Sequence, residues 1–250
     1  MIHNCPRMST YADLAYLDGP EAKDSFKTLG FPNHGFIEND GAQCHIIANE
    51  SEIVLAFRGT EPSELNDLKA DLNAWPDRAH NGHGLVHNGF QEEVNKLWPT
   101  ILERLHVMKT EGKHLFICGH SLGGAMATIA ASRLYNTDYE ATALYTYGSP
   151  RVGTRRFVRS FSGVRHYRHV NNNDIVTAVP FALLGYVHHS KPRYINYYGK
   201  IRNLTPWQRV KDKLRGRWRA IKKGQPFDGA YDHSMKYYER FCKENADGQS

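Results

Sequence analysis

The sequence predicts an α/β protein with a mainly parallel central sheet and helices on both faces of that sheet. Three observations lead to this fold class. Apolar runs typical of buried strands alternate with helix-like runs through the middle of the chain. One strand-to-helix junction carries Gly119-His120-Ser121-Leu122-Gly123. No linker-like stretch divides the 250 residues, so we expect a single domain over residues 1–250.

In the first half of the chain, the spacing of apolar residues predicts short helices at residues 8–17 and 21–29. Residues 42–48 and 52–57 are apolar, and the polar turn Asn49-Glu50-Ser51 between them predicts a β-hairpin. Residues 88–109 repeat apolar side chains every three or four positions, which is typical of a long amphipathic helix. Pro99 is expected to kink that helix.

In the second half, strands are expected at residues 114–118, 141–147, 164–170, 186–189 and 193–198. Residues 122–134 are rich in Ala, Met, Ile and Leu and predict a helix packed on its neighbours. A final helix is expected at residues 234–242, with Asp232 or Ser234 placed to cap it.

Composition favours a soluble globular protein, with 40% hydrophobic and 23% charged residues. The first residues contain no apolar core of a signal peptide, and no run approaches the roughly 18 apolar residues of a membrane span. Cysteines stand far apart, at positions 5, 44, 118 and 242, with no C-x-x-C pair, so no metal site is expected. Cys44 and Cys118 lie in apolar runs typical of reduced, buried thiols. A cytoplasmic location is the expectation; a peripheral position at a membrane and a mature secreted form with its leader removed are the alternatives.

The G-x-S-x-G pattern around Ser121 is typical of a nucleophile held on a tight turn. The apolar run before it and the alanine-rich run after it provide the strand and the helix that such a turn requires. Gly119 and Gly123 would let strand and helix pass closely. The backbone N–H of Leu122, directly after the serine, is a candidate oxyanion donor.

A serine hydroxyl needs a base and an acid that orients the base. Asp174 directly follows an expected strand in an Asn-rich turn, although a purely turn-forming role competes there. His233 stands in the loop before the last helix, where a base can reach a site. His188 and His189 are the competing bases, but they fall in an apolar, strand-like run.

Seven short pieces, in this order along the chain, resemble the class 3 lipases, the fungal-lipase-like branch of the α/β-hydrolases. They are Phe57-Arg58-Gly59-Thr60, Val86-His87-Asn88-Gly89-Phe90, Gly119-His120-Ser121-Leu122-Gly123-Gly124, Tyr147-Gly148-Ser149-Pro150-Arg151-Val152-Gly153, Asn173-Asp174-Ile175-Val176, Gly185-Tyr186-Val187-His188 and Asp232-His233. The resemblance implies the α/β-hydrolase fold and a triad of Ser121, Asp174 and His233. It also implies Thr60 as the second oxyanion donor and a lid at residues 61–69, in which Leu65 and Leu68 are the only large apolar residues.

The expected function is therefore hydrolysis of lipid or acylglycerol esters through an acyl-enzyme, without metal or organic cofactor. The alternatives are a phospholipase A1-type enzyme and a non-catalytic lipid- or partner-binding protein on a hydrolase scaffold. The G-x-S-x-G pattern alone also leaves a serine peptidase or an acyltransferase open. The oligomeric state is not indicated.

The net charge of +6 is concentrated in residues 205–224, which carry eight basic residues and one acidic residue. Apolar residues there recur at helical spacing: Trp207, Val210, Leu214, Trp218 and Ile221. A basic amphipathic helix with tryptophan is typical of a helix that contacts an anionic membrane surface, through Trp207, Trp218 and Ile221. A helix packed on its own domain by the apolar stripe is the equal alternative. Nucleic-acid binding is the weaker interpretation.

Overall fold

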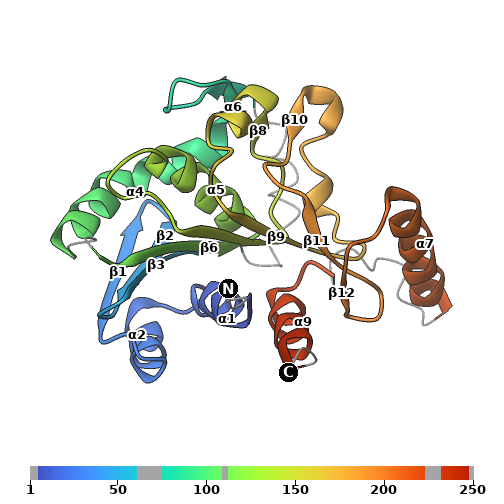
Figure 1. Ribbon diagram of the computed structural model, residues 1–250, viewed down its shortest axis with the longest axis horizontal. Helices are drawn as coiled ribbons and strands as arrows, with labels where there is room; N and C mark the ends of the chain where they lie inside the picture. Colours follow the sequence, from blue (N-terminus) through green and yellow to red (C-terminus); the bar gives the residue numbers. More distant parts are fainter. Residues whose placement is uncertain (1–4, 61–74, 109–111, 223–231, 248–250) are drawn as a thin grey trace.

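The computed structural model describes residues 5–60, 75–108, 112–222 and 232–247. Within these ranges, an eight-stranded sheet with the strand order β1-β2-β3-β6-β7-β9-β11-β12 forms the centre of the molecule (Figure 1). Neighbours from β3 to β11 pair in parallel, whereas β1-β2-β3 and β11-β12 are antiparallel. The strands are β1 (Asn33–Asn39), β2 (Ala42–Ala48), β3 (Glu52–Phe57), β6 (His114–His120), β7 (Ala143–Tyr147), β9 (His166–Asn171), β11 (Pro192–Ile195) and β12 (Ile201–Arg202).

Helices cover both faces of this sheet, so the predicted fold class is confirmed (Figure 1). α4 (Asn88–Val107) and α5 (Leu122–Leu134) lie on one face, and α1 (Cys5–Leu14), α2 (Gly19–Thr28) and α9 (Met235–Asp247) lie on the other. Each side has its own apolar core. Almost every residue of α5 is buried, because α5 is packed between the sheet and α4. Its many alanines permit that close approach.

The predicted hairpin of β2 and β3 is confirmed with its bounds, and β1 adds a further antiparallel strand that the sequence did not predict. The sequence of β1, Asn33-His34-Gly35-Phe36-Ile37-Glu38-Asn39, mixes polar and apolar residues. Its side chains are mostly exposed or half-buried because it is the edge strand, so it lacks the apolar run by which a buried strand is recognised.

A smaller four-stranded sheet with the order β10-β8-β5-β4 lies beside the main one. The strands of this sheet are very short: β4 (Pro76–Arg78), β5 (Leu85–His87), β8 (Gly153–Thr154) and β10 (Tyr186–Val187). Around it lie α6 (Arg155–Ser160) and two 3₁₀ turns, η2 (Val176–Ala178) and η3 (Ala182–Leu184). Only β10 falls in a region where the sequence predicts a strand.

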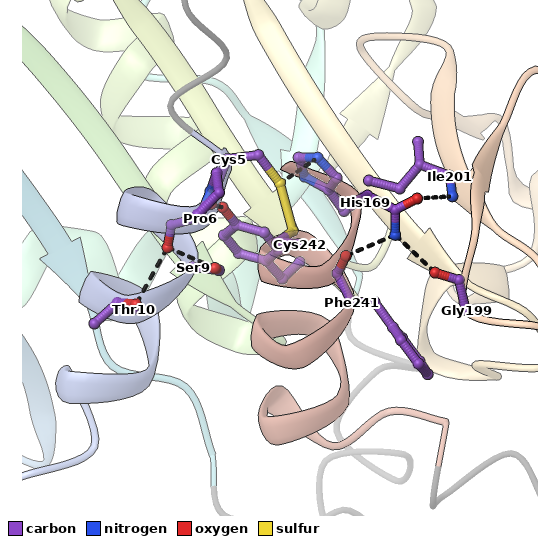
Figure 2. The surroundings of a disulfide bond; sticks show 11 residues. Cys5, Pro6, Ser9, Thr10, His169, Gly199, Ile201, Phe241 and Cys242 are labelled. Atoms are coloured by element: carbon purple, nitrogen blue, oxygen red, sulfur yellow. Dashed lines mark hydrogen bonds between the residues drawn. A yellow bond between two sulfur atoms is a disulfide. The ribbon is translucent and has the colours of Figure 1, made fainter. Parts of the chain in front are cut away.

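A disulfide joins Cys5, at the start of α1, to Cys242, in α9, across a sequence separation of 237 residues (Figure 2). His169 of β9 contacts the same pair, with its Nε2 atom 3.2 Å from Cys5 Sγ. The sequence did not predict this grouping, because the spacing of two such distant cysteines carries no signal. Cys44 and Cys118 are free and buried, as predicted.

α7 (Pro206–Lys222) occupies most of the predicted basic segment and lies at the β11-β12 end of the main sheet (Figure 1). Among the described residues, neither α7 nor any other helix is both long and apolar enough to cross a membrane.

Candidate active site

Ser121 lies on the sharp turn between β6 and α5, as the sequence predicts. Its backbone has φ 55° and ψ −126°, a strained conformation for a residue with a side chain. The flanking glycines make this turn possible: a Cβ atom on Gly123 would collide with the backbone of Phe57 and Arg58, and one on Gly119 would collide with the backbone of Gly123. The serine is consequently held directly before the first turn of α5, where backbone N–H groups point outward.

His233 connects Ser121 to Asp174 through both ring nitrogens. Its Nε2 atom lies 2.7 Å from Ser121 Oγ, and its Nδ1 atom lies 2.9 Å from Asp174 Oδ2. The three residues are at most 1% exposed. The carboxylate can only accept a hydrogen bond at neutral pH, so Nδ1 carries the proton and Nε2 is free to accept the serine proton. The structure thus brings together the three residues that the sequence nominated from positions far apart.

The turn that carries Asp174 is fixed by several hydrogen bonds. The other carboxylate oxygen, Oδ1, accepts from the backbone N–H of Val176 at 2.9 Å. The backbone N–H of Asn173 donates to Asp232 Oδ2 at 2.9 Å, which ties this turn to the loop that carries His233. Gly148 leaves the space for the contact: a Cβ atom there would lie 2.8 Å from Asp174 Oδ2 and 2.9 Å from the ring of His233.

Tyr238 of α9 is a further residue at the site that the sequence did not indicate. Its hydroxyl donates to Asp174 Oδ2 at 2.6 Å and accepts from the backbone N–H of Asn171 at 2.8 Å. Burial, together with the neighbouring carboxylate of Asp174, raises the pKa of Tyr238 well above its ordinary value, so the hydroxyl stays protonated as a donor. Nothing in the sequence around Tyr238 marks this role, because the contact depends on the docking of α9.

His120 packs against His233 and hydrogen-bonds to its backbone. Its ring lies 4.6 Å from that of His233, and its Nε2 atom donates to the backbone carbonyl of His233 at 2.6 Å. The Nδ1 atom therefore accepts, from the Tyr16 hydroxyl at 2.7 Å. Burial lowers the pKa of His120 well below its ordinary value, and a positive charge on His233 when it is protonated acts in the same direction. His120 is thus a neutral positioning group.

The two candidate oxyanion donors, Thr60 and Leu122, line one cavity of about 340 Å³. Gly59 brings the Thr60 segment against the nucleophile, since a Cβ atom on Gly59 would lie 3.3 Å from Ser121 Cβ. The same cavity is lined by Met126 and, at its polar wall, by Arg58. The predicted lid, residues 61–69 with Leu65 and Leu68, lies outside the described residues.

The competing candidates lie elsewhere. His188 Nε2 is 2.9 Å from the carbonyl oxygen of Thr177, away from Ser121, and His189 stacks on Phe161. On α7, the side chains of Trp207 and Trp218 are exposed, whereas the side chain of Ile221 lies outside the described residues.

The geometry agrees with what family comparison finds. Residues 54–184, about half of the chain, match the family Lipase (class 3). The chain belongs to the class 3 lipase family. The matched range includes Ser121 and Asp174, and His233 follows it.

Individual relatives within this family match parts of the chain. It is 37% identical over 136 residues to Toxin TseL of Vibrio cholerae, spanning 54% of this chain and 20% of the relative. It is 31% identical over 192 residues to Secreted mono- and diacylglycerol lipase A of Penicillium cyclopium, spanning 70% of this chain and 58% of the relative. The triacylglyceride lipase structure of Rhizomucor miehei superposes with a TM-score of 0.61 at 26% identity, covering 76% of this chain and 78% of that one. The chain thus spans less than two thirds of the length of each of these two sequence relatives.

Proposed function

We propose that the protein hydrolyses carboxylic esters of lipids, with acylglycerols as the substrate class. The observation that carries this proposal is the continuous set of hydrogen bonds from Ser121 through His233 to Asp174 in a buried site. Membership of the class 3 lipases supports the lipid substrate, as does similarity to a Penicillium protein named as a mono- and diacylglycerol lipase.

In the acylation step, Ser121 Oγ attacks the ester carbonyl carbon while His233 Nε2 takes the hydroxyl proton. Asp174 stabilises the positive imidazolium ring that forms. The carbonyl oxygen becomes negative and accepts hydrogen bonds from the backbone N–H groups of Leu122 and Thr60. The ester C–O bond then breaks, and His233 gives its proton to the leaving alcohol oxygen.

Deacylation repeats this chemistry with water. His233 takes one proton from water as the water oxygen attacks the acyl carbon. The bond to Ser121 Oγ breaks, the proton returns to that oxygen, and a carboxylic acid leaves. Every proton in this cycle passes through His233, which is why its orientation by Asp174 and His120 matters.

Ser121→Ala tests the proposal. The wild type is expected to hydrolyse a p-nitrophenyl ester and to be labelled by a fluorophosphonate, and the variant to do neither. Ser132→Ala is the matched control, because Ser132 is also a buried serine, on α5, and its hydroxyl donates to the backbone carbonyl of Ile129. Equal hydrolysis by wild type and Ser121→Ala would overturn the assignment. A folded wild-type protein that turns over no ester and takes no label would favour the binding-protein alternative.

We also propose that residues 205–224 make peripheral contact with an anionic membrane. Support comes from the side chains of Trp207 and Trp218, which are 65% and 57% exposed. Tryptophan on the apolar face of a basic helix is typical of helices that lie at a membrane surface.

A further inference from the structure

The inward face of α7 is polar. Asp212, which is 5% exposed, accepts hydrogen bonds from the Tyr194 hydroxyl at 3.1 Å and from the backbone N–H of Tyr197 at 2.9 Å. One turn further, Gly216 packs so closely that a Cβ atom would lie 2.5 Å from the side-chain amide nitrogen of Asn172. These contacts fix which side of the helix faces the protein.

The apolar stripe of α7 consequently points away from the protein. At about 100° per residue, Gly216 lies nearly opposite Trp207, Leu214 and Trp218 on the helix. The stripe side chains of Trp207, Val210, Leu214 and Trp218 are 65%, 46%, 59% and 57% exposed. An amphipathic helix of a globular protein ordinarily turns such a stripe toward the core. α7 does the reverse, so the interpretation of a helix packed by its apolar stripe is wrong for these four residues.

Positive charges border the exposed stripe on both sides. By the same helical geometry, Lys211 and Arg215 lie along one edge and Arg217 along the other, and all three side chains are exposed. The Lys211 Nζ atom lies 5.3 Å from the centre of the Trp207 ring. The single acidic residue in residues 205–224, Asp212, is buried on the opposite face. An apolar strip between two rows of cations is complementary to a layer of acyl chains below anionic head groups.

We propose that α7 docks on an anionic phospholipid bilayer through Trp207, Val210, Leu214 and Trp218, so that the protein takes its ester from such a bilayer. The choice of substrate source rests on the proposed ester hydrolysis, whereas the docking itself does not. The indole rings and Leu214 enter the interface, and Lys211, Arg215 and Arg217 pair with lipid phosphates at its edge.

The inward contacts give this docking a fixed relation to the site. The side-chain amide of Asn173 donates to the backbone carbonyl of Lys213 in α7 at 3.3 Å, and Asn173 directly precedes Asp174. α7 is therefore bonded to the same turn that holds the acid. When a bilayer binds the outer face of α7, these contacts therefore fix the orientation of the bilayer relative to that turn.

Vesicle co-sedimentation tests the docking, with Ser121→Ala as the background protein so that binding is measured without lipid hydrolysis. We expect strong binding to mixed phosphatidylcholine–phosphatidylglycerol vesicles, weak binding to phosphatidylcholine alone, and weakening with salt, because exposed charges are screened over about 10 Å at 0.1 M ionic strength. Adding Leu214→Ser and Trp218→Ser should lower binding at least about tenfold with an unchanged melting temperature. Lys211→Gln, Arg215→Gln and Arg217→Gln together should lower it by roughly a hundredfold.

Trp75→Ser is the matched control, because Trp75 is 86% exposed and lies outside α7. Vesicle binding that is lost in Trp75→Ser and kept in the α7 variants would overturn the proposal. Absence of binding to anionic vesicles would do the same, as would tight binding to duplex DNA without vesicle binding. Ester hydrolysis is measured separately, on protein that keeps Ser121. If that protein hydrolyses no ester, the proposed substrate source is removed, and the docking result is unaffected.

Discussion

Tyr238 gives the carboxylate of Asp174 a second strong donor, besides the ring of His233. Tyr238→Phe removes only the hydroxyl, and the phenyl ring keeps the packing of a fully buried side chain. A hydrogen bond to a charged group contributes on the order of 2 kcal/mol, so we expect kcat for a p-nitrophenyl ester to fall by at least about tenfold. KM should change little, because Tyr238 contacts the acid and does not line the cavity formed by Thr60 and Leu122.

Tyr147→Phe is the control for that experiment. The Tyr147 hydroxyl is equally buried but donates to the backbone carbonyl of Cys5 at 3.0 Å rather than to the triad. Both variants should lose some thermal stability, and only Tyr238→Phe should lose kcat. A similar fall in kcat for both would mean that Tyr238 acts through general stability.

At the residue scale, a role that depends on neighbours in the sequence was easier to predict than one that depends on residues far away in the sequence. The turn around Ser121 is a local structure, and the flanking strand and helix were enough to predict that the serine lies on a tight turn. Asp174 and His233 were nominated by chain order and by resemblance, since no local pattern distinguishes a triad aspartate from a turn-forming one. The role of Tyr238 was not predicted, because its partner Asp174 lies 64 positions away in the sequence.

At the scale of elements, the disulfide between Cys5 and Cys242 holds α9 against α1 (Figure 2). α9 also begins two residues after His233 and carries Tyr238, so this link supports the base side of the site. Cross-links that close long loops stabilise by about 2–5 kcal/mol, chiefly through the unfolded chain. We therefore expect reductant, or Cys5→Ser with Cys242→Ser, to lower the melting temperature by several degrees, measured by calorimetry.

The double variant also serves as its own control for the reductant. Because Cys44 and Cys118 are free, reductant should change the melting temperature of the wild type and leave that of the double variant where it was. A melting temperature that is the same for oxidised wild type, reduced wild type and the double variant would show that the link contributes nothing to stability.

Element identity was easier to predict than orientation. Periodicity predicted the helix α7 and its apolar stripe, but periodicity cannot say which way a stripe faces. The contacts of Asp212 and Gly216 decide that, and both depend on residues of β11 and of the Asn-rich turn. Three strands of the small sheet, β4, β5 and β8, were missed for a related reason: two or three residues carry no readable pattern.

Across the whole molecule, buried neutral histidines should make stability depend on pH. Burial lowers the pKa of His120, His166 and His188 well below their ordinary value, and lowers that of His45 from 6.5 to about 4. At pH values between 6.5 and about 4, the unfolded chain binds more protons than the native protein, so the free energy of unfolding falls as the pH is lowered. For His45 alone, the free energy of unfolding falls by roughly 3 kcal/mol once the pH is below both pKa values.

Urea unfolding at about pH 7 and about pH 4.5 measures this effect. His45→Gln keeps a hydrogen-bond donor near the Leu17 carbonyl, 3.2 Å from the histidine ring, but does not titrate. The variant should lose less stability than the wild type over this interval. His83→Gln, at an exposed position, is the control and should show the wild-type dependence. An equal loss in wild type and His45→Gln would contradict the assignment to His45.

The cellular location of the protein stays a prediction. The sequence led us to expect a cytoplasmic setting, whereas disulfides such as Cys5–Cys242 are typical of oxidising compartments. The proposed vesicle binding requires only access to an anionic lipid surface.

The Cys5–Cys242 bond also decides how the fold bears mechanical tension. Cys5 lies at the beginning of the described chain and Cys242 lies near its end, so a force applied through the two termini runs across the sulfur–sulfur bond. The chain between them, a sequence separation of 237 residues, is then a slack loop outside the path of the load. The strands of the sheet and the triad that they position are mechanically shielded for as long as the bond is oxidised.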